Sequence, residues 1–166
     1  MKIAIYPGSF DPVTLGHLNI IRRASNAFDK VIVCVLVNSG KSGIFTPDER
    51  VELLRRSINL ENVEVDMYSG LIADYARKRN ARVLVKGLRA VSDFESEVQM
   101  AIINQKLNEE LDTMFFPSSQ KYNYLSSTVA KELARYNANL EDVLPREIIA
   151  DVRIKMEDKR GACDGK

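Results

Sequence analysis

The sequence predicts an α/β protein, a single domain with a parallel five-stranded sheet and helices on both faces. Short apolar runs rich in β-branched residues alternate with longer segments whose apolar residues recur at helical spacing. The run 30–37 is apolar at every position after its first, as strands buried on both faces of a parallel sheet are. The chain has 166 residues, which is the length of one domain with a sizeable core.

The expected elements follow in chain order. Strands are expected at 2–6, 30–37, 63–67, 82–87 and 112–116. Helices are expected at 17–28, 46–59, 71–79, 92–107 and 126–136, with a last helix from Arg146 to about Asp158. The second helix has the clearest start, because Thr46 is a candidate N-cap, Pro47 follows it, and Glu49 completes a capping box. We expect one domain over residues 1–158 and a disordered tail over 159–166, which is small and polar.

The strict alternation of strands and helices predicts a Rossmann-like arrangement with right-handed crossovers. Ligands of such sheets bind beyond the carboxyl ends of the strands. Four strand-to-helix loops therefore meet at one edge, and all four carry unusual chemistry: Pro7–His17, Asn38–Thr46, Lys86–Asp93 and Pro117–Thr128. We expect the functional site where these loops converge.

Composition excludes several classes of protein. Hydrophobic residues make up 45% of the chain and charged residues 28%, and the net charge is only +1, so we expect no nucleic-acid partner. Two cysteines and one histidine offer no familiar metal-binding spacing. The first apolar run ends at Pro7, too early for a signal peptide, and no stretch approaches the length of a membrane span. We therefore expect a cytoplasmic protein without a membrane partner.

The first loop ends in the chain's only histidine. Gly16 and His17 stand at the start of the first expected helix, where free N–H groups attract anions and disfavour a protonated imidazole. A neutral His17 there could donate a hydrogen bond to a phosphate oxygen; alternatively, it only caps or packs against the helix. Neither a Walker motif nor G-x-G-x-x-G occurs in the chain, so the loop would be a phosphate site of another kind.

The other three loops add cations and a second helix start. Lys41 lies among small residues, and a ligand contact and plain surface exposure are equally good interpretations. Lys86 and Arg89 follow a buried strand and indicate anionic groups. Glu97 alone is better explained as solvated surface. The run 126–128 offers three hydroxyls at a helix start, for capping or for a phosphate. Together the loops indicate a polyphosphate ligand and direct transfer of a phosphorus centre.

Three segments carry a resemblance to known families. The stretch "PGSFDPVTLGH" resembles the T-x-G-H signature of the nucleotidyltransferase superfamily. The stretches "KGLRAVSDFESE" and "YNYLSSTVAKELAR" resemble the later motifs of the bacterial phosphopantetheine adenylyltransferases, and the likeness runs from residue 1 to about 157. It implies reversible adenylyl transfer from ATP to 4′-phosphopantetheine, giving dephospho-coenzyme A and pyrophosphate. It also implies Mg²⁺ with the ATP, a homohexamer, and feedback inhibition by coenzyme A.

The resemblance also implies roles for individual residues. His17 and Lys41 match the catalytic positions, His17 as the stabiliser of the transition state. The acceptor site is matched by Ser9, Lys41, Ile72 and Lys86. The ATP site is matched by Ser9, Phe10, His17, Gly87, Leu88, Arg89, Glu97, Tyr122, Asn123, Tyr124, Leu125, Ser126, Ser127 and Thr128. No protein ligand of the metal is implied. Lys86 departs from the arginine common in the family, and a lysine keeps the charge without the planar fork.

Other functions remain open from the residues. Nicotinamide-nucleotide and glycerol-phosphate nucleotidyltransferases share the superfamily core, although the cytidylyl enzymes commonly have histidine where Thr14 stands. A binding module of the same fold that senses nucleotides would bind ATP tightly and release no pyrophosphate. A class I aminoacyl-tRNA synthetase is disfavoured, because the chain is short and has no K-M-S-K-S motif.

Overall fold

The structure is a computed structural model that describes residues 1–37, 40, 43–89 and 91–164, with only the backbone described for 91–93 and 160–164. Five parallel strands form one sheet in the order β3-β2-β1-β4-β5. Their bounds are β1 Ile3–Gly8, β2 Lys30–Leu36, β3 Val63–Tyr68, β4 Val83–Leu88 and β5 Asp112–Pro117. The predicted fold class is confirmed.

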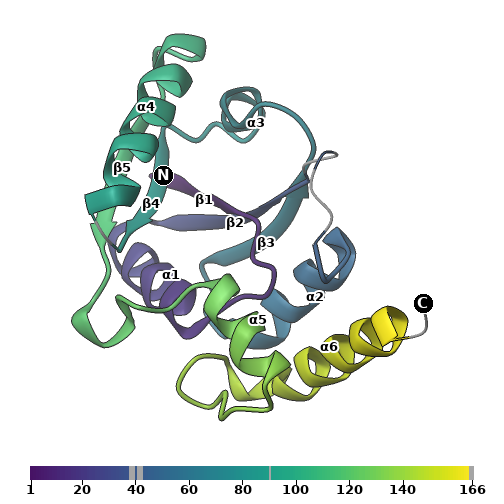
Figure 1. Cartoon of the computed structure of the whole chain (residues 1–166). Coiled ribbons are helices and arrows are strands. Elements are labelled where there is room, and N and C mark those ends of the chain that lie inside the picture. Colours follow the sequence, from purple (N-terminus) through teal and green to yellow (C-terminus); the bar gives the residue numbers. More distant parts are fainter. Residues whose placement is uncertain (38–39, 41–42, 90, 165–166) are drawn as a thin grey trace.

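Helices cover both faces of this sheet (Figure 1). Their bounds are α1 Leu15–Ala27, α2 Pro47–Ser57, α3 Ile72–Lys78, α4 Val91–Leu107, α5 Ser127–Arg135 and α6 Ile149–Asp164, and short 3₁₀ turns occur at Gln120–Tyr122 and Arg146–Ile148. In Figure 1, α3 and α4 lie on one face, and α1 and α2 lie on the other with α5 and α6 outside them. The chain therefore forms three layers.

The alternation of side chains along the strands separates two cores. On β1, Ala4 and Tyr6 face the larger core under α1, α2, α5 and α6, whereas Ile5 faces the smaller core under α3. On β2, Val33 and Cys34 divide in the same way. Both faces of the central strands are buried, which explains why their sequences are apolar throughout.

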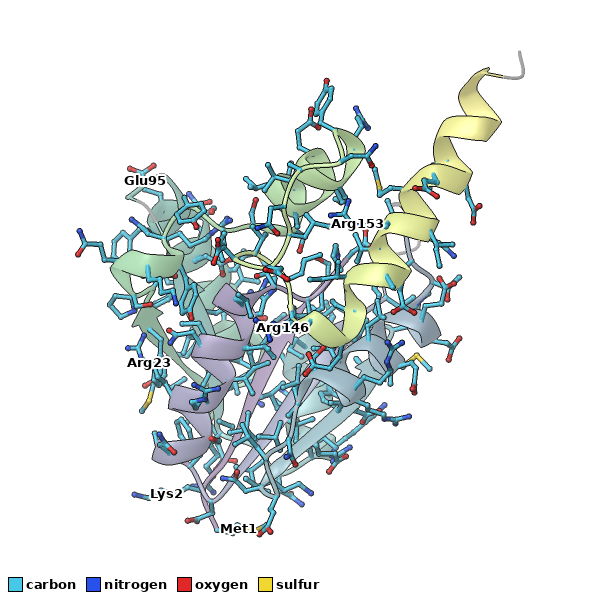
Figure 2. All side chains as sticks on the ribbon, turned by 90° about the horizontal axis from the view of Figure 1, so that it is seen from below. Met1, Lys2, Arg23, Glu95, Arg146 and Arg153 are labelled. Carbon is cyan, nitrogen blue, oxygen red and sulfur yellow. The ribbon has the colours of Figure 1, made fainter. Side chains whose placement is uncertain are left out.

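The C-terminal segment belongs to the larger core. Ile148, Val152 and Met156 are buried there, and Arg153 donates a hydrogen bond to the Ala138 carbonyl at 3.0 Å (Figure 2). The helix continues to Asp164, later than the end expected near Asp158. The expectation that residues 159–166 are disordered is a statement about their mobility, and it stays a prediction.

The order of the strands fixes where a ligand can enter. The chain passes from β1 through β2 to β3 on one side, then crosses to β4 and β5 on the other side. Neighbouring crossovers leave β1 and β4 in opposite directions, so a crevice opens beyond the carboxyl ends of these two strands. None of the helices in the described part of the chain is long and apolar enough to span a membrane.

Candidate active site

A pocket of about 420 Å³ lies beyond the carboxyl ends of β1 and β4. It is lined by residues of three of the four expected loops, together with a tyrosine of β1, an isoleucine of α1, and a serine and a glutamate of α4. The lining residues are Tyr6, Pro7, Gly8, Ser9, Phe10, Thr14, Gly16, His17, Ile20, Lys86, Gly87, Arg89, Ser96, Glu97, Ser118, Tyr122, Leu125, Ser126, Ser127 and Thr128. The expected convergence of the loops is therefore present for the first, third and fourth loops.

Most of the site residues expected from the sequence lie at this pocket. Four others do not line it: Leu88, Asn123 and Tyr124 lie nearby in the chain, and Ile72 starts α3. Ile72 is packed in the smaller core, with 9% of its surface exposed. Lys41 lies outside the described residues.

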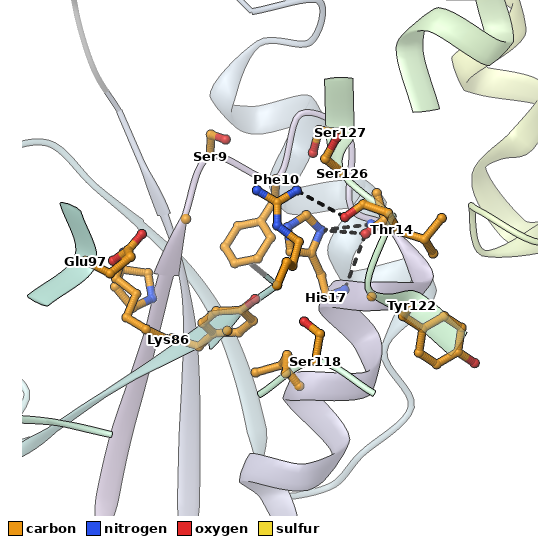
Figure 3. A pocket seen from close by; sticks show the side chains of 18 of the residues that line it. Ser9, Phe10, Thr14, His17, Lys86, Glu97, Ser118, Tyr122, Ser126 and Ser127 are labelled. Atoms are coloured by element: carbon orange, nitrogen blue, oxygen red, sulfur yellow. Dashed lines mark hydrogen bonds and ion pairs between the residues drawn. The ribbon is translucent and has the colours of Figure 1, made fainter. Parts of the chain in front are cut away.

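His17 is the third residue of α1, and its side chain completes a capping box with Thr14. The Thr14 N–H donates to His17 Nδ1 at 3.0 Å, and the His17 N–H donates to Thr14 Oγ1 at 3.3 Å (Figure 3). Glutamate or glutamine usually takes this position in a capping box. Since Nδ1 accepts a hydrogen bond from a backbone N–H, a neutral imidazole carries its proton on Nε2. His17 therefore has one nitrogen committed to the helix start and one N–H left as a donor.

The surroundings keep His17 neutral. Burial, and after it the positive charge of Arg89, lower the pKa of His17 to about 4. Phe10 packs edge-on against the imidazole, with ring centroids 5.1 Å apart. Tyr6, whose own pKa is raised by burial, packs edge-on against Phe10 at 5.4 Å. These contacts fix a neutral ring that lines the pocket.

Arg89 and the start of α5 line the same pocket as this ring. Arg89 donates to the Leu125 carbonyl at 3.1 Å, which holds the guanidinium beside the first turn of α5. Ser126 caps α5 by accepting from Val129 N–H at 3.1 Å, and Ser127 donates to the Pro12 carbonyl at 2.7 Å. Two of the three hydroxyls expected to cradle an anion therefore have structural partners. The N–H groups of the helix start remain suited to an anion.

Lys86 and Glu97 form an ion pair at the third loop, with 3.2 Å between Lys86 Nζ and Glu97 Oε2. Both side chains are about one quarter exposed, at 23% and 29%. The default interpretation of Glu97 as solvated surface is therefore too simple. Its carboxylate lies at the pocket and pairs with the lysine.

Sequence reasoning missed Asp11, whose buried side chain binds the backbone of the second loop. In the sequence it looks like one more turn residue between Phe10 and Pro12. Its partners are 33 residues or more away, so no local pattern indicates them. Tyr6 was also missed, although the alternation along β1 could have placed it beside the first loop.

The described residues offer little to a metal ion by themselves. No group of three or more His, Cys, Asp or Glu side chains gathers anywhere in the described part of the chain. Among the described residues that line the pocket, Glu97 carries the one carboxylate. Magnesium prefers oxygen ligands and commonly keeps water and phosphate oxygens around it. The site therefore fits a cation that arrives with a polyphosphate.

Comparisons with solved structures show the same fold in proteins described as nucleotide adenylyltransferases. A putative nicotinate-nucleotide adenylyltransferase from Vibrio parahaemolyticus superposes with a TM-score of 0.67 at 18% identity, covering 93% of each chain. A bifunctional NMN adenylyltransferase/ADP-ribose pyrophosphatase from Francisella tularensis gives a TM-score of 0.72 at 15% identity, covering 94% of this chain and 50% of its own. At these identities the likeness concerns the fold alone.

Comparisons of sequence are more specific. A family model described as cytidylyltransferase-like matches residues 5–133. A phosphopantetheine adenylyltransferase of Clostridium botulinum (strain 657, type Ba4) is 49% identical over 161 residues, covering 96% of this chain and 98% of the relative. Another, from strain Eklund 17B (type B), is 50% identical over 153 residues, covering 92% and 96%. The chain therefore belongs to the cytidylyltransferase-like family and, within it, to the phosphopantetheine adenylyltransferases.

Proposed function

We propose that this chain transfers the adenylyl group of ATP to 4′-phosphopantetheine, giving dephospho-coenzyme A and pyrophosphate in coenzyme A biosynthesis. The observation that carries the choice of acceptor is the identity of 49% to a phosphopantetheine adenylyltransferase over nearly the whole of both chains. The pocket supports the reaction class, because it joins two helix starts, a cation and a neutral histidine at one sheet edge.

The triphosphate is proposed to bind between Arg89 and the first turn of α5. Arg89 already lies beside that turn through its hydrogen bond to Leu125. The backbone N–H groups of 126–128 and the positive end of the helix complete the anion site. The remaining ATP contacts proposed from the family pattern are Ser9, Phe10, His17, Gly87, Leu88, Glu97, Tyr122, Asn123, Tyr124 and Leu125.

The acceptor is proposed to approach from the side of Ser9 and Lys86. Lys86 pairs with Glu97 at the pocket, and the same ammonium could bind an acceptor phosphate in place of that carboxylate. Lys41 is a further proposed contact. Ile72 is proposed to line the pantetheine channel, although its side chain packs in the smaller core and outside the pocket.

The transfer itself is a displacement at phosphorus. An oxygen of the acceptor phosphate forms a bond to the α-phosphorus of ATP, the bond from that phosphorus to the β-bridging oxygen breaks, and pyrophosphate leaves. No general base is required, because a phosphate monoester is ionised at neutral pH. Charge grows on the oxygens around the α-phosphorus, and the Nε2–H of His17 is the donor proposed to stabilise it.

Mg²⁺ is proposed to enter with ATP and to be held mainly by phosphate oxygens and water, and Glu97 carries the one carboxylate among the described residues that line the pocket. When bound it would neutralise part of the triphosphate charge. The protein's own contribution is to bind and orient the phosphates. We also infer a cytoplasmic location, where the substrates ATP and 4′-phosphopantetheine would be at hand.

Self-association is proposed as well, with a homohexamer as the family pattern implies. The helix α4 exposes large apolar side chains along much of its length, and β5 adds Met114 beside them. The exposed apolar residues of α4 are Phe94, Met100, Ile102, Ile103 and Leu107. A surface of this kind favours burial against another chain. Light scattering after gel filtration would give the number of subunits, and a monomeric mass would contradict the proposal.

Coenzyme A is proposed as a feedback inhibitor that resembles the product and competes with the acceptor. It should raise the KM for 4′-phosphopantetheine without changing kcat. If coenzyme A at saturating acceptor still lowers kcat, the inhibitor binds elsewhere.

The central experiment measures pyrophosphate release from ATP with a panel of acceptors. We expect turnover with 4′-phosphopantetheine and little with nicotinamide mononucleotide. Comparable rates with both acceptors would leave only the superfamily assignment. Tight ATP binding with no pyrophosphate release from any acceptor would favour a nucleotide-sensing module instead.

A further inference from the structure

Asp11 is a buried carboxylate with polar partners from three other segments of the chain. Its side chain is 7% exposed. Ile44 N–H donates to Oδ2 and Phe45 N–H donates to Oδ1, each at 2.9 Å. Arg50 Nε of α2 lies 3.3 Å from Oδ1, and Lys131 Nζ of α5 lies 3.5 Å from Oδ2. A buried carboxylate is tolerated when hydrogen bonds and cations compensate its lost hydration, and here each oxygen has both.

This cluster lies behind the pocket and holds the pocket's first loop. Asp11 itself does not line the pocket, but the two residues before it, Ser9 and Phe10, do. Arg50 strengthens the connection, because it donates to the Phe45 carbonyl at 2.9 Å and to the Ser9 carbonyl at 3.4 Å. The first loop and the segment 43–45 are therefore tied together by the carboxylate and by its arginine.

One further contact connects the first loop, which Asp11 and Arg50 hold, to the imidazole of His17. Phe10, which follows Ser9 in the first loop, packs edge-on against the imidazole of His17. A shift of Asp11 would move Phe10 with it, since the two are neighbours in the chain. In the sequence, residues 43–45 belong to the same loop as Lys41 and follow it.

We propose that Asp11 is a positioning residue for adenylyl transfer: its carboxylate fixes the backbone of Ile44 and Phe45 against the first loop, so that Ser9 and Phe10 keep their places beside His17. The inference rests on the proposed function for the reaction that it affects. The opposing view is that Asp11 only stabilises the fold. The two differ in what they predict for kinetics far below the unfolding temperature.

The variant Asp11→Asn tests the proposal with a side chain of the same shape. Each carboxylate oxygen accepts one backbone N–H, so either orientation of the asparagine amide turns its NH₂ toward a donor. We expect hydrogen exchange of the Ile44 and Phe45 amides to accelerate at least about tenfold, as loss of a hydrogen bond to a charged acceptor implies. We expect kcat/KM for the acceptor to fall by about 10²-fold, as a misplaced reacting group typically causes. The dissociation constant of ATP should rise by much less, because the proposed triphosphate contacts at Arg89 and the start of α5 are not altered.

Asp66→Asn is the matched control. Asp66 also pairs with an arginine, Arg79, at 2.7 Å, but it lies on β3 beside the smaller core and does not line the pocket. Its loss should leave kcat/KM for the acceptor unchanged even if the melting temperature drops. Arg50→Lys provides a second variant should Asp11→Asn fold poorly, because a lysine keeps the charge but cannot reproduce both guanidinium contacts. Arg50→Lys should also lower kcat/KM for the acceptor, but by less than Asp11→Asn does.

The outcomes separate this inference from the proposed function. If the wild-type chain does not use 4′-phosphopantetheine, the proposed function fails, and the exchange rates of Ile44 and Phe45 still test the tie. If the wild type is active and Asp11→Asn keeps its acceptor kcat/KM while only its melting temperature falls, the positioning role is overturned. Equal losses of activity in Asp11→Asn and Asp66→Asn would overturn it too, because the effect would then be general destabilisation.

Discussion

Replacing His17 separates the two tasks of its imidazole. Nδ1 accepts from the Thr14 N–H at 3.0 Å and so caps α1, whereas the Nε2–H is the donor available to the pocket. His17→Ala removes both. His17→Gln keeps the capping task, since glutamine is a natural partner at this position of a capping box, but it removes the imidazole donor.

The two tasks have different magnitudes and different measurements. Loss of the hydrogen bond from the Thr14 N–H should lower the free energy of unfolding by about 1 kcal/mol in His17→Ala and by much less in His17→Gln. Loss of one donor that acts on the transition state typically lowers kcat by about 10²–10³-fold, so both variants should fall by that order. We propose that ATP binds mainly at Arg89 and the start of α5, so its dissociation constant should change only slightly in either variant.

Three assays decide the matter: steady-state pyrophosphate release, calorimetric titration with ATP, and urea unfolding. Near-normal turnover in His17→Gln would reduce the histidine to a helix cap. A large loss of ATP affinity in both variants would make it a ground-state ligand. Either result would refute the assignment of His17 to the transition state.

Three further outcomes are expected. Lys86→Ala should raise the KM for the acceptor at least about tenfold, as loss of a charged contact does, with little effect on ATP binding, and Lys86→Arg should behave like the wild type; a collapse of ATP affinity in Lys86→Ala would contradict this role. The pKa of His17 is 6.5 in the unfolded chain and about 4 in the folded protein, so the unfolded state takes up the proton first as the pH falls. The free energy of unfolding should therefore decrease as the pH is lowered between these values. In parallel urea titrations, His17→Gln should lack this contribution. Leu144 has no exposed surface, so Leu144→Ala should lower the free energy of unfolding by about 2–5 kcal/mol while urea unfolding remains a single transition. A separate transition at lower urea concentration would mean that the C-terminal segment unfolds independently of the rest.

The fold could be predicted because each element is specified locally. The capping box of Thr46 and Glu49 is present as expected, with hydrogen bonds of 2.7 and 3.2 Å. The strand at Lys30–Leu36 is buried on both faces, as its sequence indicates. Such patterns need no knowledge of distant partners. The end of α6 was placed too early, because a polar, weakly patterned tail gives no clear stop signal.

The pocket could be predicted only in part, since its geometry depends on contacts between distant segments. The convergence of loops follows from topology, and it correctly brought together His17, Arg89 and the start of α5. The capping role of His17 was less visible, because the usual capping-box pattern asks for glutamate or glutamine. The ion pair between Lys86 and Glu97 joins a strand to a helix, and no spacing rule indicates it.

The contacts behind the pocket explain why substitutions at the imidazole should change turnover more than binding. Ser127 ties the start of α5 to the Pro12 carbonyl, Arg89 is held by the Leu125 carbonyl, and Asp11 fixes the other side of the first loop. The His17 donor and the start of α5 are therefore held in place by contacts within the protein itself. Donors that are already oriented need no rearrangement when charge develops, so their effect appears in the transition state. If the loop were instead ordered by ATP, the same substitutions would weaken ATP binding, and the calorimetric titration would detect it.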